Sequence, residues 1–141
     1  TAIRFHPVEI VLSMFVKMLL VAALGVPPVA VLAFEVILNA CAHFNHGNVR
    51  LGPRGEGVCR LLLITPDLHR IHHSADPRET NTNFGFSVPW WDRLCGTYLP
   101  HPASGQAALR IGLDEVRDHT HLRLVDLLKL PFRAWRVPVE G

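Results

Sequence analysis

Two apolar runs separated by a Gly-Val-Pro-Pro break fill most of the first third of this 141-residue chain. Residues 7–24 and residues 29–42 carry few charged side chains, and the break at residues 25–28 interrupts any continuous helix. Each run is somewhat short for a bilayer span, which needs about 20 residues. Together they predict a helical hairpin that dips into or crosses a membrane. The alternative is a pair of buried core helices in a soluble protein, because apolar runs of about 10–14 residues fit both.

Charge is distributed unevenly along the chain. The only charged residues before His43 are Arg4, Glu9, Lys17 and Glu35, whereas most of the 14 Lys and Arg residues follow it. A basic excess beside a membrane segment predicts that the following region lies on the cytoplasmic side. The net charge of +2 gives no concentrated basic face, so nucleic-acid binding is not predicted.

Polar residues interrupt the interiors of both apolar runs. Lys17 can extend its ammonium group towards an interface, and Glu35 and Asn39 lie one helical turn apart. Lipid cannot satisfy such groups, so they are expected to face protein. Two roles remain open for Glu35 and Asn39, namely contacts between helices and a position facing the histidines described next.

Four histidines form the most distinctive chemical pattern. His69, His72 and His73 lie close together, and His46 lies upstream. Residues three and four apart share a helix face, so His69 is expected beside both His72 and His73, which fan slightly apart. Neutral imidazole is the commonest metal ligand at neutral pH. This geometry predicts two metal ions side by side better than one.

The residues before these histidines predict the start of a helix. Thr65 can cap its N-terminus, Pro66 fits the first helical position, and Asp67 adds negative charge to the first turn. Residues 74–77 are predicted to form the exit. The three imidazoles at 69, 72 and 73 are therefore expected on about two helical turns, whose start is marked by Thr65 and Pro66.

Three other interpretations of these histidines compete with a metal site. The first is that they are ordinary solvated helix residues, since short motifs match by chance. A zinc hydrolase would need a glutamate after the first histidine, and Arg70 stands there instead. Nothing specific favours a bis-histidine haem protein. The three cysteines contain no CxxC pair, so they predict reduced, mostly buried thiols rather than disulfides or a zinc ribbon.

The second half of the chain reads as a soluble region with one amphipathic segment. The aromatic stretch at residues 84–91 fits either the lipid headgroup region or a packed lid. Residues 111–120 are charged, and residues 122–132 alternate apolar and charged side chains at helical spacing. The three remaining histidines of this half are predicted to lie on the surface; they are His101, His119 and His121.

Four segments together resemble the fatty acid hydroxylase superfamily, which includes sterol desaturase-like membrane enzymes. They are Arg-Phe-His-Pro-Val-Glu at 4–9, His-Gly-Asn-Val-Arg-Leu at 46–51, the HxxHH box within 65–74, and Asn-Phe-Gly at 83–85 followed by Trp-Asp-Arg-Leu-Cys-Gly-Thr-Tyr at 91–98. An HxxHH pattern alone is weak. Its order and spacing relative to the other segments make the resemblance strong.

The resemblance implies an all-α fold, with an integral membrane helical hairpin followed by a cytosolic helical histidine-box region. It implies two histidine-ligated iron ions that use O2 to hydroxylate or desaturate a sterol-type or fatty-acyl lipid, with electrons from a reductase or redox carrier. The metal ligands carried over are His46, His69, His72 and His73. His6 is included with them, although a structural role is equally open, and His43 is a candidate for supporting a ligand. Side chains that could orient the rings are, by proximity in sequence, Asn48, Asp67, Asp76 and Asp92.

The family's first two histidine boxes are absent from the sequence. They are expected just upstream of Thr1, which predicts that the chain is the C-terminal part of a longer protein and that this part alone is inactive. One domain is expected, divided into a membrane hairpin at 7–42, a cytosolic metal-box region at 43–99 and a tail at 100–141. The competing hypothesis is a truncated, catalytically inactive membrane module of the same fold.

Overall fold

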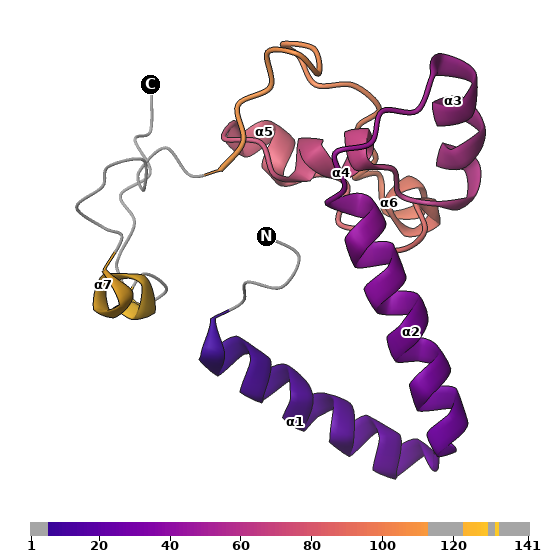
Figure 1. Cartoon of the computed structure of the whole chain (residues 1–141), viewed down its shortest axis with the longest axis vertical. Helices are drawn as coiled ribbons and strands as arrows, with labels where there is room; N and C mark the ends of the chain where they lie inside the picture. Colours follow the sequence, from indigo (N-terminus) through magenta and orange to yellow (C-terminus); the bar gives the residue numbers. More distant parts are fainter. Residues whose placement is uncertain (1–5, 113–122, 130–131, 133–141) are drawn as a thin grey trace.

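The apolar hairpin is the longest feature of the computed structural model, which describes residues 6–112, 123–129 and 132. Helix α1 spans Pro7–Leu24 and helix α2 spans Pro28–Asn45. A proline occupies the first turn of each helix, where a missing N–H costs nothing. Gly25 ends α1 in the left-handed conformation (φ 63°), and the chain reverses into α2 (Figure 1). The hairpin predicted from the two apolar runs is confirmed.

Both hairpin helices expose their apolar side chains. Each has 18 residues, and none of α1 and 11% of α2 is buried within the described structure. At 1.5 Å per residue each helix is about 27 Å long, close to the hydrocarbon thickness of about 30 Å. Core helices of a soluble protein would be mostly buried, which is not observed here. Length, composition and exposure therefore make α1 and α2 candidates for crossing a membrane.

A polar contact joins the two hairpin helices. The Lys17 ammonium group donates to Glu35 Oε1 at 2.5 Å, with both side chains about one third exposed. Asn39 turns back onto its own helix and donates to the Glu35 carbonyl at 2.8 Å. Of the two roles left open for Glu35, the structure shows the contact between helices. Neither Glu35 nor Asn39 faces the histidines.

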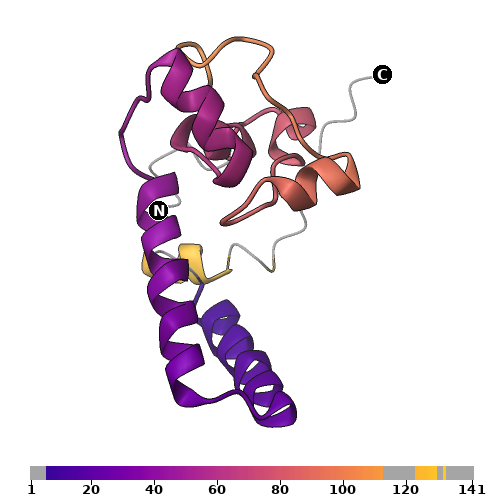
Figure 2. The same cartoon turned by 90° about the vertical axis from the view of Figure 1, so that its right-hand side faces the viewer.

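Four short helices pack at the C-terminal end of α2 (Figures 1 and 2). They are α3 (Pro53–Leu62), α4 (Pro66–His72), α5 (Pro77–Thr80) and α6 (Trp90–Cys95). Ile64, Leu68 and Ile71 form their buried apolar core. The described residues contain no β-strand, so the all-α prediction is confirmed; an isolated antiparallel bridge links Ser74 to Ile111.

The Asn-Phe-Gly segment at 83–85 and the Trp-Asp pair at 91–92 support the region around α4 with buried polar side chains. Asn83 is fully buried with φ 50°, and its side chain bonds the backbone of Leu99 in both directions at 2.9 Å. Asp92 is 2% exposed and accepts from the N–H groups of Phe84 and Gly85 at 2.8 Å. These two buried side chains replace the backbone partners that an irregular loop lacks. The fourth segment of the resemblance thus has a structural role.

The structure also tests the predictions for the aromatic stretch, the cysteines and the amphipathic segment. The aromatic stretch is exposed at Trp90 and Trp91, which argues against packing in a core. The cysteines are free, but Cys95 is exposed and the other two are half-buried, so the prediction that they are mostly buried is wrong. Helix α7 (Leu124–Lys129) occupies part of the predicted amphipathic segment. Most of residues 111–120, with His119 and His121, lies outside the described residues.

Candidate metal centre

Two helices bring three imidazoles to one point. His46 is the C-cap of α2, and His69 and His73 lie one turn apart on α4 and its C-cap. The helix start is the one predicted, since Thr65 Oγ1 accepts from the Leu68 N–H at 3.3 Å. The i, i+4 spacing puts His69 and His73 on one face, and the packing of α4 against α2 places His46 opposite them.

The three Nε2 atoms form a nearly equilateral triangle. The separations are 3.2 Å from His69 to His46, 3.2 Å from His73 to His46, and 3.1 Å from His73 to His69. His69 is 6% exposed, and the other two rings are half-buried. Nitrogen lone pairs this close repel one another unless a proton or a cation lies between them.

Backbone carbonyls fix the orientation of two rings. His46 donates from Nδ1 to the Ala42 carbonyl at 2.8 Å, and His72 donates from Nδ1 to the Thr82 carbonyl at 3.0 Å. A neutral ring that donates from Nδ1 presents a bare Nε2, which is the form that binds a metal. The Nδ1 of His69 is buried and has no hydrogen-bond partner in the described structure.

Burial keeps two of these rings neutral. Removal from water is the main cause that lowers the pKa of His69 to about 3, and the neighbouring imidazoles add to the effect. The pKa of His73 is lowered to about 4, again chiefly by burial. Both rings are therefore uncharged at neutral pH and available as ligands.

The triangle has the dimensions of a metal-ligand set. With metal–nitrogen bonds of about 2.1 Å, neighbouring nitrogens lie about 3.0 Å apart in an octahedron and about 3.4 Å apart in a tetrahedron. The observed separations of 3.1–3.2 Å fall between these values. The donor set of three neutral imidazoles suits iron, zinc, copper or nickel. The residues present therefore fit a transition metal.

His72 lies beside this group and is not part of it. Its ring stacks on His69 with the centroids 5.7 Å apart and contacts Phe84 edge-on at 5.6 Å. The group of ligand atoms within 4.8 Å of one another contains His46, His69 and His73 alone among the described residues. Among the described residues no hydrogen bond is formed by His72 Nε2, which leaves this nitrogen free to act as a ligand.

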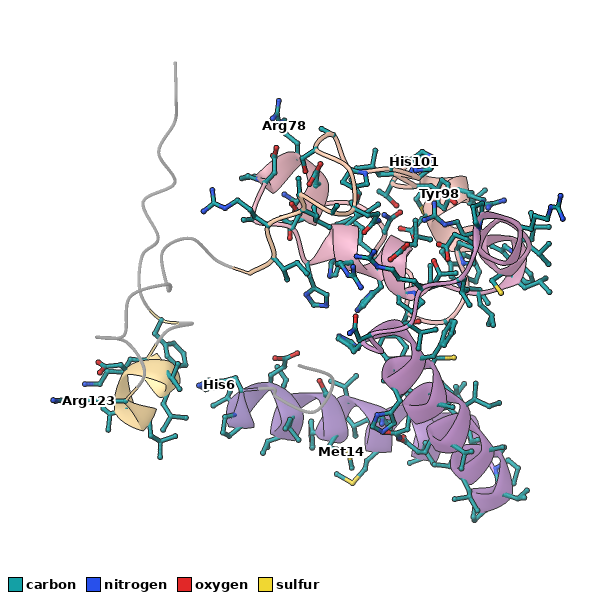
Figure 3. All side chains as sticks on the ribbon, turned by 45° about the horizontal axis from the view of Figure 1, so that its top comes forward. His6, Met14, Arg78, Tyr98, His101 and Arg123 are labelled. Carbon is teal, nitrogen blue, oxygen red and sulfur yellow. The ribbon has the colours of Figure 1, made fainter. Side chains whose placement is uncertain are left out.

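The other candidate histidines lie elsewhere. His6 caps α1, where its Nδ1 accepts from the Val8 N–H and its Nε2 contacts the Leu128 carbonyl of α7 at 3.0 Å. Figure 3 shows it at the N-terminal end of α1, near α7 and away from the helices α3 to α6. His43 and His101 are exposed and outside the group, as the surface prediction for His101 required.

The side chains expected to orient the rings have other partners. Asp92 supports the 84–85 loop, Asp76 caps α5, and Asp67 faces Arg70 at 3.8 Å. Asn48 is exposed. The groups that do orient the rings are the carbonyls of Ala42 and Thr82. For His46 the i−4 position of Ala42 on α2 was a usable signal, whereas nothing in the sequence marks Thr82.

A cavity of about 510 Å³ opens beside the three imidazoles. His46 and His73 line it, together with Asn45, Arg50 and Arg70. Two of the three imidazoles are therefore accessible from this cavity.

The fold and the site together define a class: a helical protein with two candidate membrane helices and a three-imidazole cluster able to hold a metal. The sequence profile of the fatty acid hydroxylase family matches residues 1–97, and the chain belongs to this family. This membership and the two apolar helices support association with a membrane.

Similar proteins are lipid-modifying oxygenases. The chain is 36% identical over 109 residues to the ornithine lipid hydroxylase OlsE of Rhizobium tropici, covering 72% of this chain and 30% of that protein. It is also similar to the alkylglycerol monooxygenases of Xenopus tropicalis (36%) and Danio rerio (39%), over 44 residues that cover 31% of this chain and 10% of each relative. The chain thus spans less than a third of the length of these relatives. No solved structure matches it.

Proposed function

We propose that this chain belongs to a membrane enzyme that hydroxylates or desaturates a lipid, and that its imidazoles hold iron. The convergence of the His46, His69 and His73 Nε2 atoms is the observation that carries the proposal. These three rings would hold one ion, and His72 would hold a second beside it. His6 as a ligand rests on the family resemblance alone.

For the proposed oxidation, the protein must provide imidazole ligands that are uncharged at neutral pH. When bound, two histidine-ligated irons would supply the oxidising power that turns O2 and an unactivated C–H bond into an alcohol or an alkene. Electrons would come from a reductase or redox carrier. The chain's own contribution is to keep His69 and His73 neutral by burial and to point the His46 and His72 rings with backbone carbonyls.

The names of the relatives favour a lipid with a polar head and an alkyl or acyl chain over a sterol. In the proposed arrangement α1 and α2 form the membrane hairpin, the metal-box region lies on the cytoplasmic side and the tail follows. His46 caps α2, so the cluster would stand at the bilayer surface, within reach of a lipid. The described residues offer four imidazoles here, so a two-iron centre needs further ligands from the whole protein.

Metal binding tests the ligand assignment directly. The full chain in detergent micelles should bind Fe²⁺ anaerobically, and Co²⁺ as a spectroscopic probe of nitrogen coordination. Replacing one ring, as in His69→Ala, should weaken binding at least about tenfold, the lower end of what a lost supporting contact costs. The matched control is His101→Ala, an exposed imidazole that should leave binding unchanged. Equal binding by both variants would remove the basis for the site.

Activity tests the role of His72 separately. In the full-length protein, His72→Ala should abolish product formation while leaving membrane insertion intact. Normal turnover by this variant would defeat its assignment as a ligand. A protein that binds one metal ion per chain yet turns over no lipid, even with all of its sequence present, would instead be the inactive membrane module.

A further inference from the structure

The side chains of fixed charge that line the cavity beside the imidazole cluster are all positive. Arg50 and Arg70 line it, and its described lining contains no aspartate or glutamate. The nearest carboxylate oxygen to Arg70 is Asp67 Oδ1, and at 3.8 Å this contact is too long for a hydrogen bond. The Arg70 guanidinium therefore keeps donors for another acceptor. Three other described arginines are occupied elsewhere: Arg60 donates to Glu56, Arg78 donates to Asp76, and Arg93 donates to the Arg60 carbonyl.

The rest of the lining mixes uncharged polar side chains with apolar ones. Pro66, Leu109 and Ile111 are among the lining residues, and the volume of about 510 Å³ is much larger than a single small anion requires. A guanidinium matches the two oxygens of a phosphate or a carboxylate with paired donors. The cavity thus offers guanidinium donors for an anion and apolar side chains for attached carbon atoms.

The position of the cavity selects a lipid over a free solute. Asn45 and His46 line it, and they are the last residue and the C-cap of α2, one of the two candidate membrane helices. Figure 1 shows the short helices gathered at this end of α2. A lipid whose tail lies along the hairpin would therefore place its headgroup at the level of the cavity.

We propose that this cavity binds the anionic headgroup of a lipid, through Arg50 and Arg70, and holds it next to the imidazole cluster. The shared chemistry is a phosphate or a carboxylate on a lipid. The inference rests on the proposed function in one respect only, that the bound lipid would be the one presented to the metal.

Spin-labelled lipids can measure this preference. The full chain is placed in nanodiscs of neutral phosphatidylcholine that carry labelled phosphatidylglycerol, labelled ionised stearic acid or labelled phosphatidylcholine. The protein-bound fraction of each label gives a preference for an anionic over a neutral head. Arg50→Gln with Arg70→Gln should lower that preference about tenfold, the effect of losing about one charge-assisted hydrogen bond. A loss for phosphatidylglycerol alone assigns the site to phosphate, and a loss for stearate alone assigns it to carboxylate.

The matched control removes the same charge from outside the cavity. Arg54→Gln with Arg123→Gln alters two exposed arginines and should change the preference less than twofold. An equal loss in both double variants would mean general surface charge, and no preference in the unaltered chain would mean no site; either result overturns the proposal. So would displacement of the labelled lipid by inorganic phosphate alone, which would identify a site for free anions.

Two further measurements keep the outcome interpretable. If the double variant loses helicity by circular dichroism, Arg50→Gln alone must lower the preference, and failure to do so overturns the proposal. Cobalt binding is measured in the same samples and should be unchanged in the arginine variants. An unaltered chain that prefers anionic lipids but binds no metal would sink the proposed function and leave the headgroup site standing.

Discussion

The ring of His69 is more buried than the rings of His46 and His73, which it contacts. Its Nε2 faces His46 and His73, its Nδ1 is buried without a partner, and 94% of its surface is covered, as its 6% exposure implies. The same side chain at position 101 is exposed. The difference is the environment of the ring, which decides whether an imidazole is a surface base or a neutral ligand.

Stability of the metal-free chain should depend on pH because of these rings. Unfolded histidine titrates near pH 6.5, whereas the folded pKa is about 3 for His69 and about 4 for His73. Between about pH 6.5 and about pH 4 the unfolded chain binds more protons, so the free energy of unfolding falls as pH falls through this window. For His69 the loss should be on the order of 2 kcal/mol at about pH 4.5.

Thermal unfolding in detergent micelles, followed by far-ultraviolet circular dichroism across this window, checks the expectation. His69→Gln removes one titrating ring and should flatten the decline, while the exposed control His101→Gln should leave it unchanged. Parallel curves for all three chains would show that these rings do not carry the effect.

At the scale of single elements, the sequence signals for helix ends agree with the observed helix bounds. The Pro66 start of α4 followed from Thr65 and Pro66, and the Pro7–Leu24 bounds of α1 followed from the apolar run and Gly25. These sequence patterns do not predict which side chains of different helices come into contact. Lys17 and Glu35 are 18 positions apart, and the hairpin turn is what brings them to 2.5 Å.

The Lys17–Glu35 pair offers a double-mutant test of the hairpin. Lys17→Met or Glu35→Met leaves one charge unpaired between two apolar helices, which should destabilise the folded hairpin by about 1–3 kcal/mol. The double replacement should recover much of that loss, because no charge is then left without a partner. Unfolding in mixed micelles with rising dodecyl sulfate measures the four stabilities. Additive losses would mean that the pair is not coupled.

At the scale of the molecule, a hydrogen bond near the imidazole cluster joins the apolar hairpin to the loop before α6. Asn45 is 4% exposed and donates to the Phe86 carbonyl at 2.6 Å. Its neighbour along the chain is His46, which closes the imidazole triangle from the hairpin side. The position of His46 relative to His69 and His73 therefore depends on how these two regions pack.

Asn45→Ala should separate metal binding from folding. It removes this contact and leaves the Phe86 carbonyl unpaired, so Co²⁺ affinity should fall by roughly tenfold, as for loss of a group that supports a ligand. Helix content should stay the same, because Asn45 lies at the end of α2. The exposed Asn48→Ala serves as the control and should bind like the unaltered chain. Unchanged affinity in Asn45→Ala would show that α2 is held by other contacts.

The sequence by itself determined the local features of this protein. Apolar runs, prolines and a left-handed glycine specify the hairpin, and Thr65 with the histidine spacing specifies α4 and its face, because each signal acts within one or two turns. Only the tertiary structure decided that His46 joins His69 and His73 while His72 turns to Thr82, and that Arg50 and Arg70 share a cavity. These contacts join residues far apart in the chain, and their geometry is set by packing around Ile64, Leu68 and Ile71, which no local pattern encodes.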